Sequence, residues 1–264
     1  MDKVRLGMIG SQFAAHLHLN SLSTLRGSKV DVVAVASKNK EHAQSFAKHF
    51  NIPDYYDDYR LVLERKDVHV VDLCVATHLH HSMAIDAANA GKHIICEKPL
   101  TGFFGDGKTV SRQVMMEEAL ENASSVLKAV QTNRVKFGYA ENFVYAPPVT
   151  KLKNLMKACQ GTVLDIRAEE SHSGSHSVFS REWRTSGGGS LMRLGSHPIG
   201  AVLHLKHYEG LLKFGRPIRA KSIIGDVGSL TKMDAFRKEP KKWLVDYWGD
   251  VEDWSAALIT FEDG

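Results

Sequence analysis

The chain has 264 residues, of which 43% are hydrophobic and 24% are charged, and its formal net charge is +4. This composition is typical of a globular protein with room for two domains of ordinary size. The basic surplus is small and spread along the chain, so it argues against a nucleic-acid partner and allows only a weak attraction for anionic ligands.

Cysteine usage and hydropathy indicate the compartment in which such a protein works. Cys74, Cys96 and Cys159 lack the spacing of a metal site, and we interpret them as buried free thiols in a reducing compartment. The first residues run straight into an apolar strand pattern and do not resemble a signal peptide. No apolar stretch approaches the roughly 18 residues that span a bilayer. The expected location is cytoplasmic, with no membrane partner.

Strand and helix patterns alternate through the first half of the chain. Strict alternation indicates a doubly wound parallel sheet, and right-handed crossovers favour a Rossmann topology. The predicted strands are Val4–Ile9, Val30–Ala36, Val68–Ala76, His93–Cys96 and Lys136–Tyr139, and the predicted helices are Phe13–Leu25, Glu41–Phe50, Asp57–Arg65, Met83–Ala90 and Glu117–Thr132.

The pattern changes after residues 146–148. A helical stretch at Val149–Ala158 and strand-like stretches at Val163–Glu170, Ala220–Asp226 and Ala256–Phe261 predict an α+β domain with a mostly antiparallel open sheet. We therefore expect a dinucleotide-binding domain over residues 1–140 and a substrate-binding and oligomerisation domain over residues 141–264. The last residues read as a hairpin turn without a returning strand, so we expect the C-terminal part of a longer protein to be absent.

Residues 10–15 read Gly-Ser-Gln-Phe-Ala-Ala directly after the first predicted strand. A dinucleotide-binding turn usually reads G-x-G-x-x-G/A, because its glycines let helix amides reach the pyrophosphate. Gly10 and Ala15 fit this pattern, and Phe13 and Ala14 begin the helix. Gln12 replaces the middle glycine, so its side chain must either crowd the pyrophosphate or turn aside. An ordinary strand–helix turn is the alternative.

Ser37 and Lys38 follow the second predicted strand. An acidic residue at this place would bind the ribose 2′-hydroxyl of NAD. A hydroxyl and a cation suit a 2′-phosphate instead, which mildly favours NADP. The alternative is that Lys38 is a solvated loop lysine.

The most informative segment, Gly91 to Leu100, reads G-K-H-I-I-C-E-K-P-L. It resembles the Gfo/Idh/MocA family, the glucose–fructose oxidoreductase and inositol dehydrogenase group, in which a strand end carries G-K-H-V-x-x-E-K-P. The resemblance covers essentially the whole chain, with Ala76 standing where proline is common. Further matches lie at Gly10 to His18, Asp72 to His80, Glu141-Asn142, Trp183-Arg184, Gly187 to Leu191 and Gly195 to Pro198.

The resemblance implies an NAD(P)-dependent oxidoreductase acting on a hydroxyl or carbonyl of a sugar, polyol or sugar acid, with Lys98 at its centre. A lysine at the carboxyl edge of a parallel sheet lies where such folds bind ligands, and its cation can polarise a substrate oxygen. The alternative is a surface lysine beside a turn proline. The remaining residues expected at the cofactor are Ala76, Thr77, His80, Glu97, Trp183 and Arg184.

Many family dehydrogenases carry an aspartate and a histidine four residues apart on one helical face, and here the two positions read Arg193 and His197. His197 is the expected acid–base group, because an imidazole titrates near neutral pH. A histidine packed at a domain interface is the alternative. Arg193 cannot take up a proton. We expect it to bind a substrate carboxylate or phosphate, to pair with Glu141, Glu169 or Glu170, or to point to solvent.

Residues 169–176 read Glu-Glu-Ser-His-Ser-Gly-Ser-His, which superficially resembles a metal site. We expect this segment to line the substrate pocket instead, with His176 as a substrate-binding residue and no metal. Asn142 and Tyr145 complete the expected substrate-binding residues.

Two other functions on the same fold stay open. One is an enzyme that holds NAD tightly and cleaves glycosides, or eliminates a group, through transient oxidation. The other is a non-enzymatic, ligand-sensing regulator. Arg193 keeps the first possible. Gln12 and Arg193 weakly favour the second, whereas Lys98 and His197 argue against it. The expected partners are a carbohydrate-like substrate and further copies of the chain, in a homodimer or homotetramer formed through the second domain's sheet.

Overall fold

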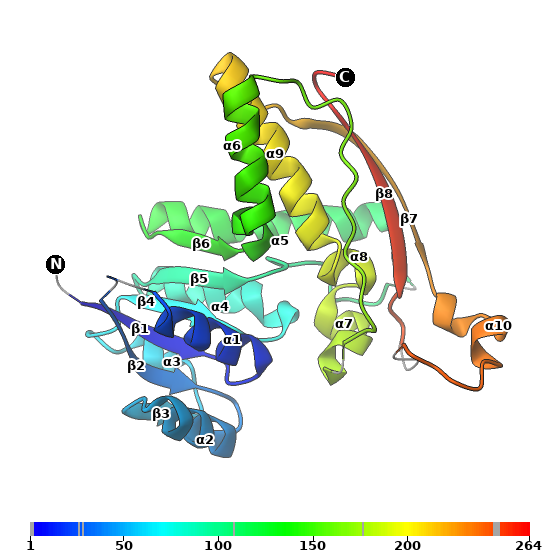
Figure 1. Cartoon of the computed structure of the whole chain (residues 1–264). Coiled ribbons are helices and arrows are strands. Elements are labelled where there is room, and N and C mark those ends of the chain that lie inside the picture. The colour runs from blue at the N-terminus through cyan, green and yellow to red at the C-terminus, as the bar shows by residue number, and fades with distance from the viewer. Residues whose placement is uncertain (1–2, 26, 28, 108, 176, 245–248) are drawn as a thin grey trace. The chain divides into compact units, whose positions relative to one another are not determined.

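The computed structural model describes residues 3–25, 27, 29–107, 109–175, 177–244 and 249–264 (Figure 1). The chain divides into two compact units, Met1–Ala140 and Glu141–Gly264. Within the described ranges, no helix combines the length and the apolar character needed to cross a membrane.

The first unit is built on a six-stranded sheet in which all the paired strands run parallel. Its order, β3-β2-β1-β4-β5-β6, is that of a Rossmann fold, so the predicted fold class is confirmed. The strands are β1 (Val4–Ile9), β2 (Val30–Ala36), β3 (Asp54–Tyr56), β4 (Val70–Leu73), β5 (His93–Glu97) and β6 (Phe137–Ala140).

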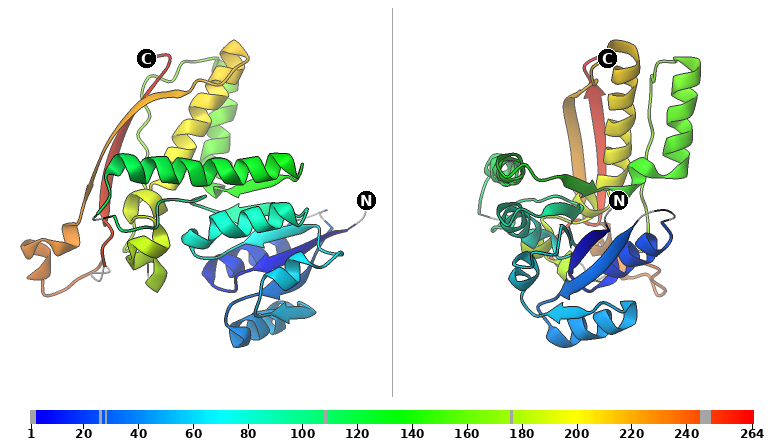
Figure 2. Two further views of the ribbon diagram at one scale, coloured as in Figure 1. Left: turned by 180° about the vertical axis from the view of Figure 1, so that it is seen from behind. Right: turned by 90° about the vertical axis from the view of Figure 1, so that its left-hand side faces the viewer.

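Helices cover both faces of this sheet, as Figures 1 and 2 show. Helices α1 (Phe13–Ser23) and α2 (Lys40–Phe50) bury Leu19 and Phe46 against one face. On the other face, α3 (Arg60–Leu63), α4 (Thr77–Asn89) and α5 (Arg112–Thr132) bury a second apolar cluster. Both faces are therefore dry, which explains why the strands read as continuous apolar runs rather than alternating ones.

Four predicted elements of the first unit differ from the structure, and one of them is helix α5, which starts five residues earlier than predicted, at Arg112. The three-residue strand β3 was missed and the helix after it is shorter than predicted, because so short an edge strand carries no readable periodicity. Strand β4 ends at Leu73, so residues 74–76 are a loop. Helix α4 starts six residues earlier than predicted, at Thr77, since its first turns are rich in histidine and lack an apolar stripe.

Strand register brings distant parts of the chain to one edge of the sheet. Ile9 pairs with Ala36 on one side and with Leu73 on the other, and Leu73 pairs in turn with Cys96. Since the strands are parallel, the residues that follow them lie along the same carboxyl edge. The connections leave β1 in opposite directions across the sheet, so a switch point lies between β1 and β4, where such folds bind ligands.

The second unit contains a two-stranded antiparallel sheet, β7 (Ala220–Gly228) and β8 (Trp254–Phe261), which confirms the predicted antiparallel character. Helix α9 (Ser196–Phe214) packs against α6 (Pro147–Cys159). The shorter elements are the 3-10 turns Asn142–Tyr145, Val178–Arg181 and Leu230–Lys232 and the helices α7 (Trp183–Ser186), α8 (Ser190–Arg193) and α10 (Asp234–Arg237).

The prediction of a strand at Val163–Glu170 is wrong. Within the described chain, residues 160–175 form no helix or strand, and Leu164 is 92% exposed. The backbone N–H of Val163 donates to the carboxylate of Glu209 rather than to a neighbouring strand. An alternating pattern forms a strand only when a partner strand takes up its backbone groups.

A buried cluster of charges joins α9 to the chain around it. Lys206 Nζ donates to Glu209 Oε2 at 2.8 Å and to Asp263 Oδ2 at 2.7 Å, and Lys213 Nζ donates to Glu209 Oε1 at 2.9 Å. Glu209 is 1% exposed and Lys206 is 3% exposed. Burial alone would raise the pKa of Glu209, but hydrogen bonds from Lys206 and Lys213 lower it. The pairs stabilise the second unit only because each buried charge has a partner.

Replacing Lys206 by Met should lower the free energy of unfolding by about 3 kcal/mol, because the buried Glu209 then keeps only Lys213 and Asp263 loses its ion pair with Lys206. Urea denaturation measures the loss. The Lys213→Met variant is the matched control: its ammonium is more exposed, so its loss should be clearly smaller. Equal losses for the two variants would contradict the assignment of Lys206 as the central cation.

Candidate active site

The turn between β1 and α1 depends on a glycine. Gly10 has a φ of 112°, and a Cβ atom at this position would lie 2.1 Å from the carbonyl oxygen of Cys74. Its N–H donates to Ala36 O at 2.8 Å. Only glycine lets the backbone cross the end of β4 this closely, so the turn delivers the start of α1 to the switch point of the sheet.

Gln12 turns aside from this turn. Its side-chain amide donates to Nδ1 of His42, on α2, at 3.3 Å. Phe13, the first residue of α1, is 79% exposed. The first amides of a helix have no partner within it and bind anions. With Gln12 held by α2, the cradle formed by Gly10 and the start of α1 fits a pyrophosphate group.

Ser37 and Lys38 lie directly after β2, at the same edge of the sheet. Ser37 is half-buried, with its N–H donating to Tyr56 O, and Lys38 is exposed. The side chain of Asn39 accepts the His42 N–H and caps α2. This loop therefore presents a hydroxyl and a cation where an acidic residue is expected in an NAD site.

Lys98 follows the last residue of β5, and its backbone is fixed on both sides. Before it, Glu97 Oε2 accepts the Lys98 N–H at 3.0 Å. After it, the Lys98–Pro99 peptide is cis, and the carbonyl oxygen of Pro99 lies 2.8 Å from Nδ1 of His80. The cofactor candidates Ala76 and Thr77 are at the neighbouring strand end, where α4 begins.

His80 is a buried side chain between the loop that carries Lys98 and the loop before α4. Its ring is 1% exposed, and Nε2 lies 3.1 Å from the carbonyl oxygen of Val75. Burial lowers the pKa of His80. Both ring nitrogens lie close to backbone carbonyl oxygens, and a neutral ring donates a hydrogen bond to one of them. This side chain, expected beside the cofactor, therefore packs between the loop that carries Lys98 and the loop before α4.

A buried charge cluster lies beside Lys98. His18, on α1, donates from Nδ1 to Asp72 Oδ2 at 2.8 Å and from Nε2 to Glu97 Oε1 at 2.9 Å. Burial alone would lower the pKa of His18, but hydrogen bonds with Asp72, Cys74 and Glu97 raise it to about 12. His18 is thus an imidazolium between two carboxylates. Glu97 was expected to contact the cofactor, yet both its carboxylate oxygens are used inside the protein.

Sequence reasoning did not assign a role to His18 or Asp72. One signal could have pointed to them. Asp72 is a carboxylate in the otherwise apolar strand β4 and is 1% exposed, and a buried charge requires a partner. The identity of that partner depends on which helix crosses the strand end, which the local pattern does not contain.

The same cluster contains the one group of metal-type ligands in the described part of the chain. The ligand atoms of His18, Asp72 and Cys74 all lie within 4.8 Å of one another. Burial raises the pKa of the Cys74 thiol to about 12, so it is a thiol rather than a thiolate. The protonated His18 ring already supplies a cation here, and a metal would have to displace its proton. Cys74 and Cys96 are buried free thiols, as predicted, whereas Cys159 is exposed.

In the second unit, His197 is paired with Glu141. The ring Nδ1 donates to Glu141 Oε1 at 2.8 Å, and the ring of Phe143 stacks on the imidazole at 4.2 Å. Glu141 is 4% exposed and lies against Gly200 of α9, where a Cβ atom would come within 2.9 Å of its side chain. Its second oxygen, Oε2, has no hydrogen-bond partner among the described residues. The pair fixes the imidazole and directs Nε2 away from Glu141.

Arg193 and His197 do not share one helix, which corrects the expected arrangement. Helix α8 ends at Arg193 and α9 begins at Ser196, with Gly195 packed against the Leu191 carbonyl between them. The Arg193 guanidinium lies over the ring of Phe179 at 5.0 Å, and burial lowers its pKa. The residue as a whole is half-buried.

Glu252 holds the triple-glycine loop before α8. Its carboxylate accepts the N–H groups of Gly189 at 2.7 Å and of Leu191 at 3.1 Å. A Cβ atom at residue 189 would lie 1.7 Å from the Glu252 carbonyl oxygen. Glycine is thus required at residue 189 because a second backbone segment crosses it, and Glu252 is a further residue that the sequence pattern did not reveal.

The remaining candidates of the second unit lie on its short elements. The Trp183 N–H donates to Asp250 Oδ1, and its buried indole Nε1 has no hydrogen-bond partner within the described ranges. Arg184 is exposed on α7, and Asn142 and Tyr145 are exposed on the 3-10 turn after Glu141. His176 lies outside the described residues.

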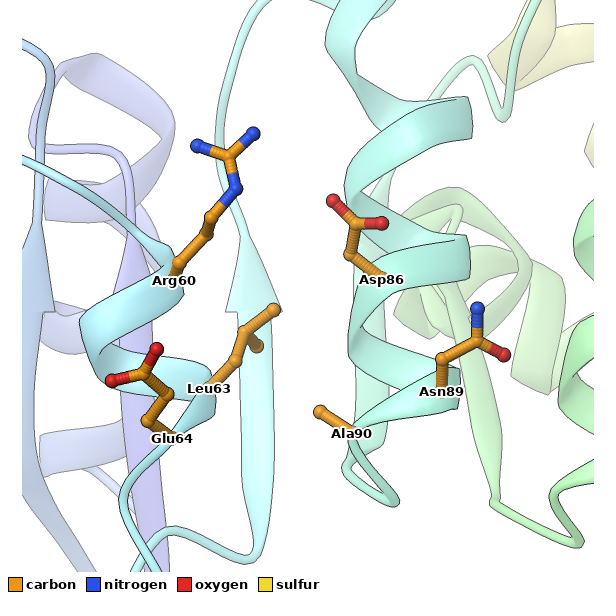
Figure 3. Close-up of a pocket in the computed structure, with 6 residues that line it drawn as sticks. All are labelled: Arg60, Leu63, Glu64, Asp86, Asn89 and Ala90. Atoms are coloured by element: carbon orange, nitrogen blue, oxygen red, sulfur yellow. The ribbon is translucent and has the colours of Figure 1, made fainter.

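Figure 3 shows a hollow between α3 and α4 of the first unit. Helix α4 starts at the carboxyl edge of the sheet and ends at Asn89, so this hollow, at the end of the helix, lies at the opposite edge from Lys98. It is no part of the candidate site. Its lining residues are Arg60, Leu63, Glu64, Asp86, Asn89 and Ala90.

Comparison with known proteins agrees with the fold and the motifs. Residues 4–137 match the GFO_IDH_MocA family, described as an oxidoreductase family with an NAD-binding Rossmann fold. The chain belongs to this family, as the Gly91 to Leu100 segment predicted.

Among curated relatives, levoglucosan dehydrogenase of Pseudarthrobacter phenanthrenivorans is 27% identical over 219 residues, which are 78% of this chain and 52% of that protein. Trans-1,2-dihydrobenzene-1,2-diol dehydrogenase of Mus musculus is 27% identical over 191 residues, which are 71% of this chain and 52% of that protein. The chain therefore spans about half the length of these relatives.

Solved structures share the fold over the whole chain. Levoglucosan dehydrogenase in complex with NADH superposes with a TM-score of 0.70 at 21% identity, covering 100% of this chain and 65% of that one. An NAD-binding protein from Listeria innocua superposes with a TM-score of 0.73 at 19% identity, covering 100% and 63%. At these identities the similarity shows the fold alone.

The His18 cluster predicts a pH dependence of stability. The pKa of His18 is higher in the folded than in the unfolded chain, so its stabilisation is complete below about pH 6.5 and is lost as pH rises towards the folded value. Between pH 7 and pH 9, the difference in free energy of unfolding between wild type and His18→Gln should shrink by up to about 1.4 kcal/mol per pH unit. Urea denaturation at several pH values measures it. A constant difference would show that His18 is neutral in the folded protein.

Proposed function

We propose that this chain acts as an NAD(P)-dependent oxidoreductase on a hydroxyl or carbonyl of a sugar, polyol or sugar acid. Residues 1–140 bind the dinucleotide, and residues 141–264 bind the substrate and mediate self-association. The observation that carries the proposal is the placement of Lys98. Its backbone is fixed on both sides at the carboxyl edge of the sheet, on the same edge as the Gly10 turn. In this fold, that edge is where ligands bind.

The residues of the first unit fit the nucleotide. The open turn at Gly10 and the start of α1 suit a pyrophosphate, and Ser37 with Lys38 suits a ribose 2′-phosphate, which favours NADP over NAD. When bound, nicotinamide supplies the acceptor or donor for a hydride. Trp183 and Arg184 are proposed as further cofactor contacts, since the buried indole Nε1–H of Trp183 lacks a hydrogen-bond partner among the described residues.

Lys98 and His197 have different parts in the proposed reaction. The Lys98 ammonium donates a hydrogen bond to the reacting oxygen and stabilises the negative charge that builds up there. His197 takes the hydroxyl proton during oxidation and returns one during reduction. Glu141 holds the imidazole through Nδ1, so that Nε2 is the atom that exchanges the proton. This is the orienting role that a carboxylate has behind a catalytic histidine.

The substrate class rests on the names of the relatives. Levoglucosan and dihydrobenzenediol both carry hydroxyl groups on a ring, so a cyclic polyol is the common chemistry. Arg193 adds a cation in the second unit where many family members have an aspartate. We propose that it binds an acidic group of the substrate, because a guanidinium pairs bidentately with a carboxylate or phosphate.

A nucleotide titration followed by turnover tests the function. NADP⁺, NADPH, NAD⁺ and NADH are compared by thermal unfolding, in which a ligand at 100 times its Kd adds about 2.7 kcal/mol. The nucleotide that binds most tightly is then used to assay levoglucosan, D-glucose, D-glucuronate and myo-inositol by nicotinamide absorbance.

Lys98→Met should lower kcat/KM by roughly 100-fold or more, and His197→Gln should do the same. Lys66→Met, at an exposed loop, is the control and should leave it unchanged.

Failure of all four nucleotides to stabilise the chain would overturn the proposed function. Tight binding without turnover of any compound would favour a ligand-sensing regulator. Conversion of a glycoside without a net change in nicotinamide absorbance would favour the transient-oxidation reaction.

Arg193→Ala and Arg193→Asp separate acidic from neutral substrates. For the matched pair D-glucuronate and D-glucose, each variant should lose roughly tenfold or more in kcat/KM on the acid relative to the neutral sugar, since a hydrogen bond to a charged group is removed. Steady-state kinetics on both sugars measure the ratio. Equal losses of kcat/KM on the two sugars would contradict the anion-binding role.

A further inference from the structure

The backbone of Lys98 is connected to the centre of the sheet by a chain of three hydrogen bonds. Glu97 Oε2 accepts the Lys98 N–H at 3.0 Å, while Glu97 Oε1 accepts from His18 Nε2 at 2.9 Å. The other ring nitrogen, Nδ1, donates to Asp72 Oδ2 at 2.8 Å. These hydrogen bonds connect β4, through α1, to the residue after β5, so three separate elements determine where Glu97 lies.

A glutamate does not by itself hold the N–H of the next residue in one geometry. Its side chain has three rotatable bonds, and fixing them costs entropy that one local hydrogen bond barely repays. Here the imidazolium fixes the second oxygen of Glu97, and the buried Asp72, 1% exposed, fixes the imidazolium. Removing His18 would leave two buried carboxylates without their shared cation, which is strongly unfavourable.

The charges along this series of hydrogen bonds, from Asp72 to Lys98, are balanced. His18 carries a positive charge between the carboxylates of Asp72 and Glu97, and the ammonium of Lys98 adds the second positive charge. Cys74, 3.4 Å from His18 Nδ1, is a neutral thiol. His80, whose Nδ1 contacts the carbonyl oxygen of Pro99, is held neutral by burial. The cluster therefore keeps Glu97 anionic and in place.

We propose that His18, anchored by Asp72, is a positioning residue that acts through Glu97 to hold Lys98 in its reactive place. The inference rests on the proposed function only in treating Lys98 as the reacting group. A small displacement of such a group lowers the rate of a reaction without changing how tightly the cofactor binds.

Two conservative substitutions of His18 separate positioning from simple structural support. The amide of glutamine reaches about as far as Nε2 and can keep the hydrogen bond to Glu97, whereas the amide of asparagine reaches only as far as Nδ1 and can bond to Asp72 alone. Both remove the positive charge, so both destabilise the fold in the same way. His16→Asn, on the same helix but packed against Phe46 and Phe50, is the matched control.

Amide hydrogen exchange, followed by NMR, reads the Lys98 N–H directly and needs no substrate. In His18→Asn, exchange at Lys98 should speed up about tenfold or more, the equivalent of one hydrogen bond to a charged group. In His18→Gln, which keeps the bond to Glu97 but loses the one to Asp72, the increase should be clearly smaller than in His18→Asn, and in His16→Asn the exchange rate should stay near wild type. Asp72→Asn, which removes the anchor and keeps the shape, should also speed exchange at Lys98. The amides of Ile94, Ile95 and Cys96 in β5 should not change selectively.

Equal acceleration in His18→Gln and His18→Asn would overturn the proposal, as would acceleration spread evenly along β5. No change in Asp72→Asn would remove Asp72 from it. With a sugar that the wild type converts, His18→Asn should lower kcat while leaving the Kd of the nucleotide unchanged. A weaker affinity for the nucleotide with an unchanged kcat would also overturn the proposal. If wild type binds no nucleotide, the proposed function fails, yet the exchange pattern still decides whether His18 positions Lys98.

Discussion

The parallel register of the first unit is the constraint on which its candidate site depends. Ile9, Ala36, Leu73 and Cys96 lie side by side across four strands, so the residues after them end at one edge. A one-residue slip in any pair would move every side chain of that strand to the opposite face of the sheet, where it would meet the wrong apolar cluster. The dry apolar faces that fix the register therefore also determine which functional groups meet.

Buried charge serves different purposes in the two units. In the first, Asp72 and Glu97 share the His18 cation, and the result is a fixed backbone at Lys98. In the second, Glu209 lies between Lys206 and Lys213, and the result is a fixed helix α9, which begins with the catalytic candidate His197. Replacing such pairs by apolar residues often leaves stability unchanged. Their value in this protein is geometric, since they hold particular atoms at particular places.

The replacement of the family aspartate by Arg193 has a structural counterpart. A carboxylate still accompanies the histidine, but Glu141 supplies it from the turn after β6, and Gly200 leaves the space that it needs. Arg193 lies on a separate short helix against Phe179. The carboxylate that pairs with the histidine and the residue four positions before it are therefore different residues in this protein. This leaves Arg193 available for a different task in the proposed site.

Local sequence patterns determined the elements that are long or have a strict motif. The alternating strands and helices, the Gly10 turn and the segment ending in Glu97-Lys98-Pro99 identified the Rossmann class, the family and the central lysine, because each depends on residues close together in the chain. Boundaries at residues 74–83 were less readable, since a run of histidines hides the helical period there.

Tertiary structure alone decided which side chains form hydrogen bonds with one another. Nothing local shows that His18 meets Asp72 and Glu97, which are 54 and 79 residues away, or that Glu141 meets His197 rather than Arg193. The stretch Val163–Glu170 has a strand-like pattern, but its first N–H is taken by Glu209 and the described chain supplies no neighbouring strand. Periodicity reports which face of a segment is apolar. Which groups lie opposite that segment depends on strand order, register and helix crossing, and these exist only once the whole chain has packed.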